Sequence, residues 1–577
     1  MFRPLTALAA TTLIAFAPAA AHAQEAAIYS SMDAVHPVWS KEAMVSVQEA
    51  VAADIGLQVL KDGGNAVDAG VAVALALAVT LPRAGNLGGG GFMMVHDAES
   101  GETKAIDYRE MAPASATRDM YLDAEGNADS TLSRFHGLAV GVPGTVAGMQ
   151  LALETYGTLT LAEAAEPAIR LAEDGIVVTA DLADSLKSLE KRLKTWPASA
   201  AIFYKPDGSF YEPGDVLKQP DLAATLKKIA AEGPDGFYTG EVAEAISASV
   251  EEAGGSMTVE DLANYKAVIR EPVTGTYRGH EIVSMPPPSS GGTHIIQILN
   301  VMEGYPIGFL GHNSSDTIHL MAEAMKRAYA DRSEYLGDPD FTDVPVAALT
   351  SKDYAAKIRD GISLNRATPS SSIKPGKLSP YESDQTTHFS IVDKDGNAVS
   401  NTYTLNFSYG SGMTAAGTGV LLNNEMDDFS AKPGVPNAYG LIGGDANAVE
   451  PGKRPLSSMS PTIVLKDGKP LLVTGSPGGS RIITTTLQLI SNMIDHGMNV
   501  AEATHASRIH HQWLPDEIRV EDSGLSRDTV AALEAKGHTI TVKSVMGSTQ
   551  SIHVDAEKGL LLGASDPRRT GSATVGY

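Results

Sequence analysis

Apolar and polar residues alternate along two short stretches, 387–392 and 398–405, which are separated by the sequence Asp-Lys-Asp-Gly-Asn. Alternation with a period of two, rich in β-branched and aromatic residues, predicts two β-strands, and an Asp-Gly pair between them predicts a hairpin turn. If Asp395 and Gly396 form a two-residue loop, the numbers of opposing residues sum to about 791. Thr386 is then expected beside the far end of the second strand.

Helical periods surround this hairpin in the sequence. Residues 65–81 are nearly all Ala, Val and Leu, and because the run is short and contains Asp68 we expect a buried core helix and not a membrane span. One amphipathic helix, ended by Trp196-Pro197, is predicted from the spacing of Leu182, Leu186, Leu189 and Leu193. Further helices are expected at 52–61, 221–232, 241–252, 315–336 and 480–496, the last with Ser480 as its cap.

The remaining strand signals come in separate blocks from the long helices. Strands are expected at 417–429, at 461–474 with a turn at Asp467-Gly468, and at 550–554 and 560–564. Blocks of strand and blocks of helix indicate layered α/β packing. Four consecutive glycines at 88–91 do not open a helix with a phosphate-binding spacing, so we interpret them as a tight packing loop.

The segment 365–385, directly before the hairpin, contains three prolines, no helical period and few apolar residues. Such a long stretch without secondary structure is unusual in a compact chain unless it is mobile or functional. One interpretation is a solvated linker. The other is that the chain is cut at its end, between Gln385 and Thr386. Thr386 would then carry a free amine, which titrates at about 7.7–8.0 and can act as base for its own hydroxyl.

The composition narrows the class of protein. The chain has 577 residues and a formal net charge of −25, which argues against nucleic acid or an anionic membrane as partner. The length alone predicts two to four domains. The absence of cysteine from the sequence excludes disulfides, thiolate metal sites and cysteine nucleophiles.

Residues 1–23 have the pattern of a secretory signal peptide. Arg3 is the single charge, 8–16 form an apolar core, and Ala21-His22-Ala23 fits the small-x-small rule for cleavage before Gln24. The apolar run is too short for a permanent anchor. We therefore expect export, with a bacterial periplasm as the destination.

Two histidine patterns raise the question of a metal. His319 and Glu323 lie one turn apart on the predicted helix 315–336, but no third ligand is evident in the sequence and no H-E-x-x-H pattern occurs. His510 and His511 are adjacent, and on an extended chain they point to opposite faces. A packing role is favoured for all four residues, and no metal site is predicted.

Residues 386–410, TTHFSIVDKDGNAVSNTYTLNFSYG, resemble the signature of the γ-glutamyltranspeptidases, a family of N-terminal-nucleophile hydrolases. The resemblance extends over nearly the whole chain after residue 30. The further matching blocks, in order, are GNLGGGGFM at 85–93, DYREMAP at 107–113, MPPPSSGG at 285–292, LLNNEMDDFS at 421–430, RPLSSMSPT at 454–462 and TGSPGGSRI at 474–482.

The resemblance implies a mixed α/β (α+β) fold, the four-layer αββα sandwich, built jointly by two fragments of one cleaved chain. These would be a large fragment, 24–385, with a mobile linker at 365–385, and a small catalytic fragment, 386–577. Cleavage between Gln385 and Thr386 would not separate them, because their apolar faces are buried against each other.

The resemblance also implies the catalytic groups. Thr386 would be the nucleophile, with the hydroxyl of Thr404 supporting its amine. Gly478 and Gly479 would offer backbone N–H groups to the oxyanion, aided by the positive end of the helix that follows.

For substrate binding, the resemblance implies that Arg109 grips the α-carboxylate of a γ-glutamyl donor, since its planar fork suits two parallel hydrogen bonds. Ser457 and Ser458 would donate to the same carboxylate. The groups expected to receive the α-ammonium are Asn406, Glu425 and Asp428. Residues 433–444, PGVPNAYGLIGG, resemble a lid loop over the donor pocket, with Tyr439 at its tip.

The implied activity is γ-glutamyl transfer and hydrolysis without metal or organic cofactor. Thr386 would attack the γ-amide of glutathione or a related donor, and water, an amino acid or a peptide would resolve the acyl-enzyme. One alternative is a cephalosporin acylase that removes a glutaryl side chain. Another is an uncleaved periplasmic protein that binds glutamyl peptides without turnover. An α/β serine hydrolase is disfavoured because no G-x-S-x-G occurs in the sequence.

Overall fold

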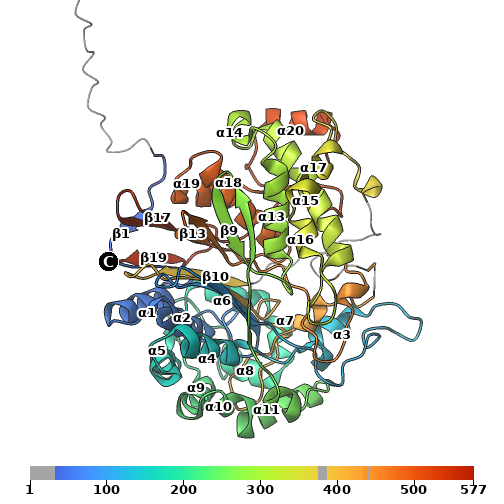
Figure 1. The fold of residues 1–577 in the computed structure, drawn as a ribbon. Coiled ribbons are helices and arrows are strands. Elements are labelled where there is room, and N and C mark those ends of the chain that lie inside the picture. The colour runs from blue at the N-terminus through green and yellow to red at the C-terminus, as the bar shows by residue number, and fades with distance from the viewer. Residues whose placement is uncertain (1–32, 374–385, 433, 436, 438–440) are drawn as a thin grey trace, which may run out of the picture. The chain divides into compact units, whose positions relative to one another are not determined.

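Two seven-stranded sheets lie at the centre of the fold (Figure 1). The structure is a computed structural model that describes residues 33–373, 386–432, 434–435, 437 and 441–577. The first sheet has the order β19 (Ala573–Gly576), β2 (Met44–Val47), β10 (Thr387–Val392), β11 (Ala398–Thr404), β3 (Gly90–His96), β4 (Thr103–Tyr108) and β7 (Val268–Arg270). The second has the order β1 (Val38–Ser40), β18 (Leu560–Ser565), β17 (Gln550–Asp555), β13 (Lys469–Thr474), β12 (Thr462–Lys466), β9 (His280–Ser284) and β8 (Val273–Tyr277). Neighbouring strands in both sheets are antiparallel.

The sheets pack face to face and helices cover their outer faces. Phe92 and Met94 of the first sheet share an apolar cluster with Ile463 and Val473 of the second. On the outer face of the first sheet lie α1 (Ala50–Lys61), α2 (Ala66–Thr80), α4 (Thr145–Tyr156), α5 (Leu161–Asp174) and α9 (Pro220–Glu232). On the outer face of the second lie α13 (Gly291–Met302), α15 (Ser315–Tyr335), α18 (Arg481–Ile494) and α19 (Val500–His505). The expected αββα arrangement is confirmed.

The remaining elements extend the two helical layers. The smaller helices are α3 (Ser130–Phe135), α6 (Ala180–Ser188), α7 (Glu190–Lys194), α8 (Pro197–Phe203), α10 (Asp235–Tyr238), α11 (Gly240–Glu252), α12 (Val259–Ala263), α14 (Ile307–Leu310), α16 (Val346–Leu349), α17 (Lys352–Asp360) and α20 (Arg527–Ala535). The short strands are β5 (Ile176–Val177), β6 (Val216–Leu217), β14 (Ile509–His510), β15 (Ile518–Glu521) and β16 (Ile540–Lys543). Residues Val35–Tyr577 form one compact unit, so the two to four domains suggested by length are not found there.

The predicted hairpin is β10–β11, with a register that differs by one residue from the expected one. Opposing residues, such as Thr387 and Tyr403, sum to 790 and not 791. The reason is the turn: Asp393 pairs with Asn397 through a backbone hydrogen bond of 3.1 Å, leaving a three-residue loop that ends at Gly396 with φ of 91°. A three-residue loop with glycine in the left-handed region is the next common hairpin geometry after the two-residue turn.

Several sequence predictions hold and others do not. The helices and strands expected at 52–61, 65–81, 221–232, 241–252, 315–336, 461–474, 550–554 and 560–564 are found with small shifts at their ends. The single helix predicted over Leu182–Leu193 is wrong, because the chain breaks at Leu189 between α6 and α7. The strand expected at 417–429 is also wrong: isolated bridges and the 3₁₀ turn η3 (Glu425–Asp428) stand there.

The first part of the segment 365–385 is held by the rest of the chain. The Ala367 N–H donates to the Lys536 carbonyl at 2.8 Å, and the Ser370 N–H donates to Asp516 at 2.8 Å. The indole N–H of Trp513 donates to the Ser370 carbonyl at 3.0 Å. Anchoring by residues more than 140 positions away was not visible in the composition of the segment. Residues 374–385 lie outside the described part.

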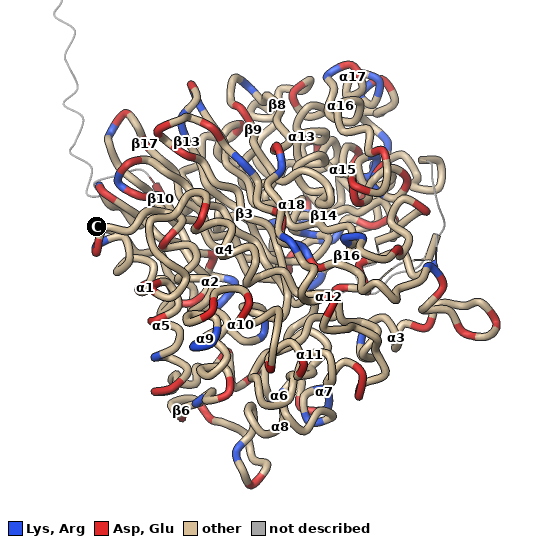
Figure 2. The backbone as a smooth tube through the Cα atoms, turned by 60° about the horizontal axis from the view of Figure 1, so that its bottom comes forward, with Lys and Arg blue, Asp and Glu red and all other residues tan. Residues whose placement is uncertain are grey.

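Acidic positions are spread over many helices and loops, with basic positions among them (Figure 2). The excess of negative charge is therefore not confined to one element. Within the described part of the chain, no helix combines the length and the apolar character that crossing a bilayer requires. The proposed signal peptide, 1–23, falls outside the residues that the structure describes.

Candidate active site

Thr386 lies at the open end of the β10–β11 hairpin, one residue before β10 begins. Its hydroxyl donates to the hydroxyl of Thr404, the last residue of β11, at an O–O distance of 3.4 Å. Thr404 also accepts a hydrogen bond of 2.9 Å from the backbone N–H of Asn406, whose φ of 71° turns the chain away from the strand. The hairpin thus brings together the predicted nucleophile, the second hydroxyl and the amide that the sequence placed there.

The glycine run at 88–91 makes room for this strand end. A Cβ atom at Gly89 would lie 2.1 Å from the Thr404 carbonyl oxygen, so only glycine allows this approach. Asn86 fixes the same carbonyl with a hydrogen bond of 2.9 Å. The glycines therefore form the tight packing loop that the sequence indicated.

One pocket is lined by all the predicted site residues except Gln385, Gly478 and Tyr439. Its lining consists of Arg109, Thr386, Thr404, Asn406, Glu425, Asp428, Leu441, Ser457, Ser458, Met459, Gly479 and Ile482. Thr404 ends β11, Glu425 and Asp428 lie in η3, Ile482 lies in the first turn of α18, and the other lining residues lie in loops. Sequence reasoning missed the apolar wall of Leu441, Met459 and Ile482, because an isolated apolar residue carries no signal that it faces a ligand.

Arg109 is fully buried and ion-paired at the base of this pocket. Its Nη1 pairs with Glu425, its Nη2 lies 2.6 Å from Asp428, and its Nε donates to the Pro455 carbonyl at 3.1 Å. The expected carboxylate clamp and two of the expected ammonium acceptors thus bind one another. Asp428 keeps the most exposure of the three, with 11% of its side chain accessible.

A third carboxylate, Glu110, was not predicted from the sequence. It is fully buried, neither of its carboxylate oxygens has a hydrogen-bond partner among the described residues, and Oε2 lies 3.6 Å from Arg109 Nη1. Burial raises the pKa of Glu110 to about 7, against the lowering effect of Arg109. Burial likewise raises the pKa of Glu425 well above its usual range. Three acids therefore surround one buried arginine, and since burial opposes the ionisation of Glu110 and Glu425, a positive ligand group beside them would favour their charged forms.

Gly478 and Gly479 precede α18 with φ values of 134° and 54°, which favour glycine. Within the described residues neither backbone N–H donates a hydrogen bond, whereas both carbonyls are used by Arg481 and Ile482. Unpaired N–H groups at the positive end of a helix suit an anion. Ser480 stands at the N-cap position of α18, as predicted, but its hydroxyl donates to Gln512 at 2.7 Å and makes no capping hydrogen bond to the helix.

Ser457 and Ser458 lie on the opposite wall, held by the loop 285–292. The Ser457 N–H donates to the Pro288 carbonyl at 2.8 Å, and the Ser290 hydroxyl donates to the Ser457 carbonyl at 2.8 Å. The Ser458 hydroxyl accepts a hydrogen bond of 3.3 Å from Arg332, a residue that the sequence did not single out. The function of the MPPPSSGG block therefore includes fixing this pair of serines.

Two predicted residues cannot be placed. Gln385, on the other side of the proposed cleavage bond, and Tyr439, at the tip of the proposed lid, both lie outside the described residues. Leu441, two positions after Tyr439, does line the pocket. The roles given to Gln385 and Tyr439 stay predictions.

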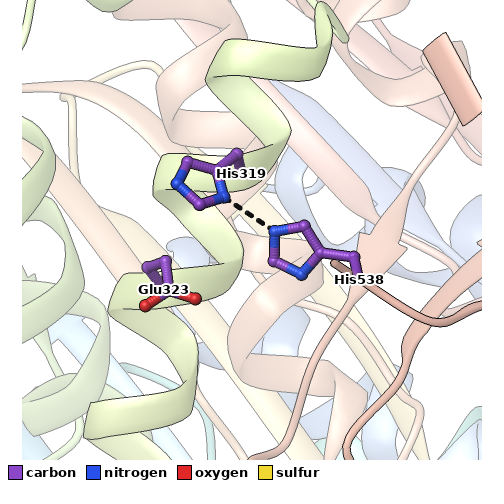
Figure 3. Close-up of side chains that lie close together, drawn as sticks. All are labelled: His319, Glu323 and His538. Carbon is purple, nitrogen blue, oxygen red and sulfur yellow. Dashed lines mark hydrogen bonds between the residues drawn. The ribbon is translucent and has the colours of Figure 1, made fainter. Parts of the chain in front are cut away.

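A second buried polar cluster contains a third potential metal ligand, which was not evident from the sequence. His538 lies beside His319 and Glu323 (Figure 3), and its Nε2 is 2.7 Å from His319 Nδ1. Glu323 is nevertheless already paired with Lys326 and with Arg327 at 2.8 Å. We call these five residues the α15 cluster.

The α15 cluster binds the segment that leads toward the hairpin. His319 Nε2 lies 2.6 Å from the Ser363 carbonyl, and the Thr368 N–H donates to Glu323 at 3.0 Å. Lys326 donates to the Thr368 carbonyl at 2.6 Å. Two cations and an N–H already satisfy the carboxylate, so a third, metallic charge would face repulsion. This arrangement fits the packing role better than a metal centre.

Comparison with known proteins shows what the chain is similar to. The sequence profile described as Gamma-glutamyltranspeptidase matches residues 52–576. The chain is 60% identical over 546 residues to the glutathione hydrolase proenzyme of Escherichia coli K12, covering 94% of this chain and 93% of that protein. It is 40% identical over 544 residues to the acylase ACY 1 proenzyme of Pseudomonas sp. strain SE83, covering 93% and 94%.

Solved structures give the same relationship. The cephalosporin acylase of Bacillus halodurans superposes with a TM-score of 0.83 at 30% identity, covering 96% of this chain and 98% of that one. The γ-glutamyltranspeptidase of Helicobacter pylori superposes with a TM-score of 0.56 at 51% identity, covering 56% of this chain and 93% of that chain. Proenzymes and acylases are thus both among the relatives.

Proposed function

The chain belongs to the γ-glutamyltranspeptidase family, and we propose that Thr386, freed by self-cleavage of the Gln385–Thr386 bond, carries out its γ-glutamyl transfer and hydrolysis. The observation that carries this assignment is the position of Thr386. Its side chain lines a pocket together with Gly479, whose N–H has no partner among the described residues, and with the charged side chains of Arg109, Glu425 and Asp428.

Maturation requires an attack within the chain. The Thr386 hydroxyl oxygen adds to the Gln385 carbonyl carbon, the C–N bond breaks, and the amine of Thr386 takes up a proton as the ester forms. Water then opens the ester and restores the hydroxyl. The result is a large fragment ending at Gln385 and a small one beginning at Thr386, which agrees with the description of the relatives as proenzymes.

Turnover uses the same oxygen. The free amine of Thr386 accepts the proton of its own hydroxyl, and the oxygen attacks the γ-carbonyl of the donor. The N–H groups of Gly478 and Gly479 stabilise the oxyanion, a contribution of about 2.7–4 kcal/mol per donor in comparable sites. The leaving amine departs with the proton, and water or an acceptor amine then attacks the acyl-enzyme.

The charged groups give a physical account of donor recognition. The α-ammonium of the donor would approach Asp428, Glu425 and Asn406, while its α-carboxylate would meet Arg109 and the two serines. In the ligand-free site Arg109 pairs with the two acids. A zwitterion inserted between them keeps every charge paired, because each buried ion exchanges one counter-charge for another.

The donors expected from this chemistry are glutathione and related γ-glutamyl compounds, and the acceptors are water, amino acids or dipeptides. No nucleic acid, membrane or cofactor enters the proposed reaction. The proposed signal peptide implies action in the periplasm after export.

A glutaryl-side-chain acylase is the second candidate, because acylases of 40% and 30% identity are relatives. A glutaryl group has no α-ammonium, so Asp428 and Glu425 would remain without a cationic ligand in that reaction. Three acids around one buried arginine therefore favour the γ-glutamyl donor.

Matched chromogenic donors test the proposal. Purified protein is assayed with γ-glutamyl-p-nitroanilide and with glutaryl-p-nitroanilide, and a denaturing gel is run beside the assay. We expect two bands and a preference for the γ-glutamyl donor. A preference for the glutaryl donor would support the acylase, and a single 60 kDa band with ligand binding but no turnover would support the binding protein.

A further inference from the structure

Arg332 is a buried cation beside the pocket that has no carboxylate partner. It lies on α15 with 4% of its surface accessible. Nε donates to the Ser290 hydroxyl at 2.9 Å, and Nη2 donates to the Ser458 hydroxyl at 3.3 Å. Within the part of the chain that the structure describes, Nη1 makes no hydrogen bond and no carboxylate lies within ion-pair distance of the guanidinium. A buried charge without a counter-ion is expensive unless something supplies one.

Arg109, the other arginine at this site, is in the opposite state. Its three nitrogens are used by Glu425, Asp428 and the Pro455 carbonyl. Burial lowers the pKa of Arg332 to about 10, while Asp428 raises it and Arg109 lowers it. Arg332 is thus charged at neutral pH and close enough to these two residues to interact with them electrostatically.

Ser458 connects Arg332 to the pocket. Its oxygen accepts from Arg332, and its own O–H has no acceptor among the described residues. Because a hydroxyl has one proton to donate, a cation that occupies its lone pair directs that proton away from itself. Ser458 lines the pocket, so the pocket is where an acceptor for that proton would lie.

Ser290 fixes the other end of the guanidinium. Its hydroxyl accepts from Arg332 Nε and donates to the Ser457 carbonyl at 2.8 Å. The Ser290 N–H donates to the same carbonyl at 2.9 Å. The loop 285–292 and α15 therefore hold the arginine in one orientation, which explains why a block far from the nucleophile in sequence belongs to the site.

We propose that Arg332 is a positioning residue for the α-carboxylate of the donor, acting through Ser458 and through its own uncompensated charge. This inference rests on the proposed γ-glutamyl activity. The donor's α-carboxylate would accept a hydrogen bond from Ser458 and provide the counter-charge that no described residue provides within ion-pair distance of Arg332. Arg109 already pairs with two acids. It would therefore contribute well-oriented hydrogen bonds to the donor's α-carboxylate more than an additional positive charge.

The test compares a donor that has the α-carboxylate with one that lacks it. γ-Glutamyl-p-nitroanilide and its α-carboxamide are assayed with the wild type, Arg332→Met and Arg332→Lys. The measured quantity is the ratio of kcat/KM for the two donors. We expect Arg332→Met to lower this ratio at least about tenfold, through KM of the carboxylate donor, with an intermediate ratio for Arg332→Lys.

Two controls separate this effect from a loss of packing. Arg327→Met removes an arginine from the same helix that contacts neither serine, and its ratio should equal that of the wild type. Ser290→Ala keeps the charge but frees one end of the guanidinium, so its ratio should fall by a few-fold. If Arg332→Met is not processed, the same ratio of kcat/KM values is measured for Arg332→Lys and Ser290→Ala, and these two variants then test the inference.

The outcomes test this inference separately from the proposed γ-glutamyl activity on which it rests. If the wild type does not turn over the γ-glutamyl donor, the proposed function and this inference both fall. If the wild type is active and the Arg332 variants keep its ratio, the inference alone is overturned. A lowered ratio in processed, active variants supports it.

Discussion

The pocket at Thr386 and the α15 cluster are both buried groups of charged side chains, but they differ in what the chain leaves unsatisfied. In the α15 cluster, Glu323 is bound by Lys326, Arg327 and the Thr368 N–H. In the pocket, the N–H group of Gly479 has no partner among the described residues.

Side chains at the spacing of metal ligands therefore do not by themselves identify a ligand-binding site. His319, Glu323 and His538 lie close enough for a metal, yet the charge of the cluster is already balanced by the chain. The pocket has N–H donors, carboxylates and a buried cation. One zwitterionic ligand would provide a partner for each of them. Buried polar groups without a hydrogen-bond partner are the better indicator of a ligand-binding site, because such groups are rare in proteins and usually have a functional reason.

Replacing the nucleophile should have the largest effect. Thr386→Ala removes both the attacking oxygen of maturation and that of turnover, so activity should fall roughly 10⁴-fold or more and the chain should stay whole. Thr387→Ala is the matched control, since its hydroxyl is buried and without a hydrogen-bond partner. Activity is measured by p-nitroanilide release and integrity on a denaturing gel. A processed and active Thr386→Ala protein would contradict the pocket assignment.

Removing an acid from the pocket should have the next largest effect. Asp428→Asn leaves Arg109 with one counter-charge fewer and removes a partner of the α-ammonium, at a cost of about 2–5 kcal/mol, or roughly 30-fold or more in kcat/KM. A glutaryl donor, which lacks that ammonium, should be affected less. Equal losses for both donors would show that Asp428 acts on structure and not on the ammonium.

Substitutions in the α15 cluster should change the stability of the protein and not its preference between the two donors. Although burial raises the pKa of Glu323, Lys326, Thr368 and Arg327 together lower it to about 2. Because the folded-state pKa lies below the unfolded value, the stabilisation is present above about pH 4.5 and is lost as the pH falls toward 2. Glu323→Gln should therefore lower the free energy of unfolding by at most about 3 kcal/mol at pH 7.

Urea unfolding of Glu323→Gln and wild type at pH 7 and pH 3 checks this sign. The difference between the two proteins should shrink at pH 3, where the wild-type carboxylate begins to take up its proton. A difference that grew on acidification would mean that the carboxylate is not held by the two cations. The ratio of γ-glutamyl to glutaryl activity should not change in this variant.

Metal removal should have the smallest effect. Prolonged dialysis against a chelator is expected to change the activity and the melting temperature by less than the error of the assays, because Glu323 already has its counter-charges. His538→Ala serves as the matched variant. A drop in melting temperature on chelation that is absent in His538→Ala would show that the cluster holds a metal after all.

Local patterns predicted the elements and the hairpin well. Alternation placed β10 and β11 within one residue of their bounds, and the composition of 65–81 predicted α2. The one-residue register difference arose because a three-residue turn competes with the two-residue one at the same Asp-Gly pair. The break at Leu189 shows tertiary packing overriding a periodic pattern.

The site residues came from motif resemblance, and the structure adds what no local pattern contains. Arg109 pairs with Glu425 across 316 positions, and His319 meets His538 across 219. Arg332, on α15, and Glu110, in the loop after β4, were not singled out from the sequence, since an arginine or glutamate is usually at the surface. Only the folded chain shows that both are buried beside the pocket.

The most direct test of the account is intact mass spectrometry with N-terminal sequencing of the purified wild-type chain. We predict two fragments that remain associated under native conditions, the smaller beginning with Thr386-Thr387-His388. A single uncut chain that still transfers γ-glutamyl groups, or a smaller fragment that begins at any other residue, would contradict the claim that Thr386 acts through its own free amine.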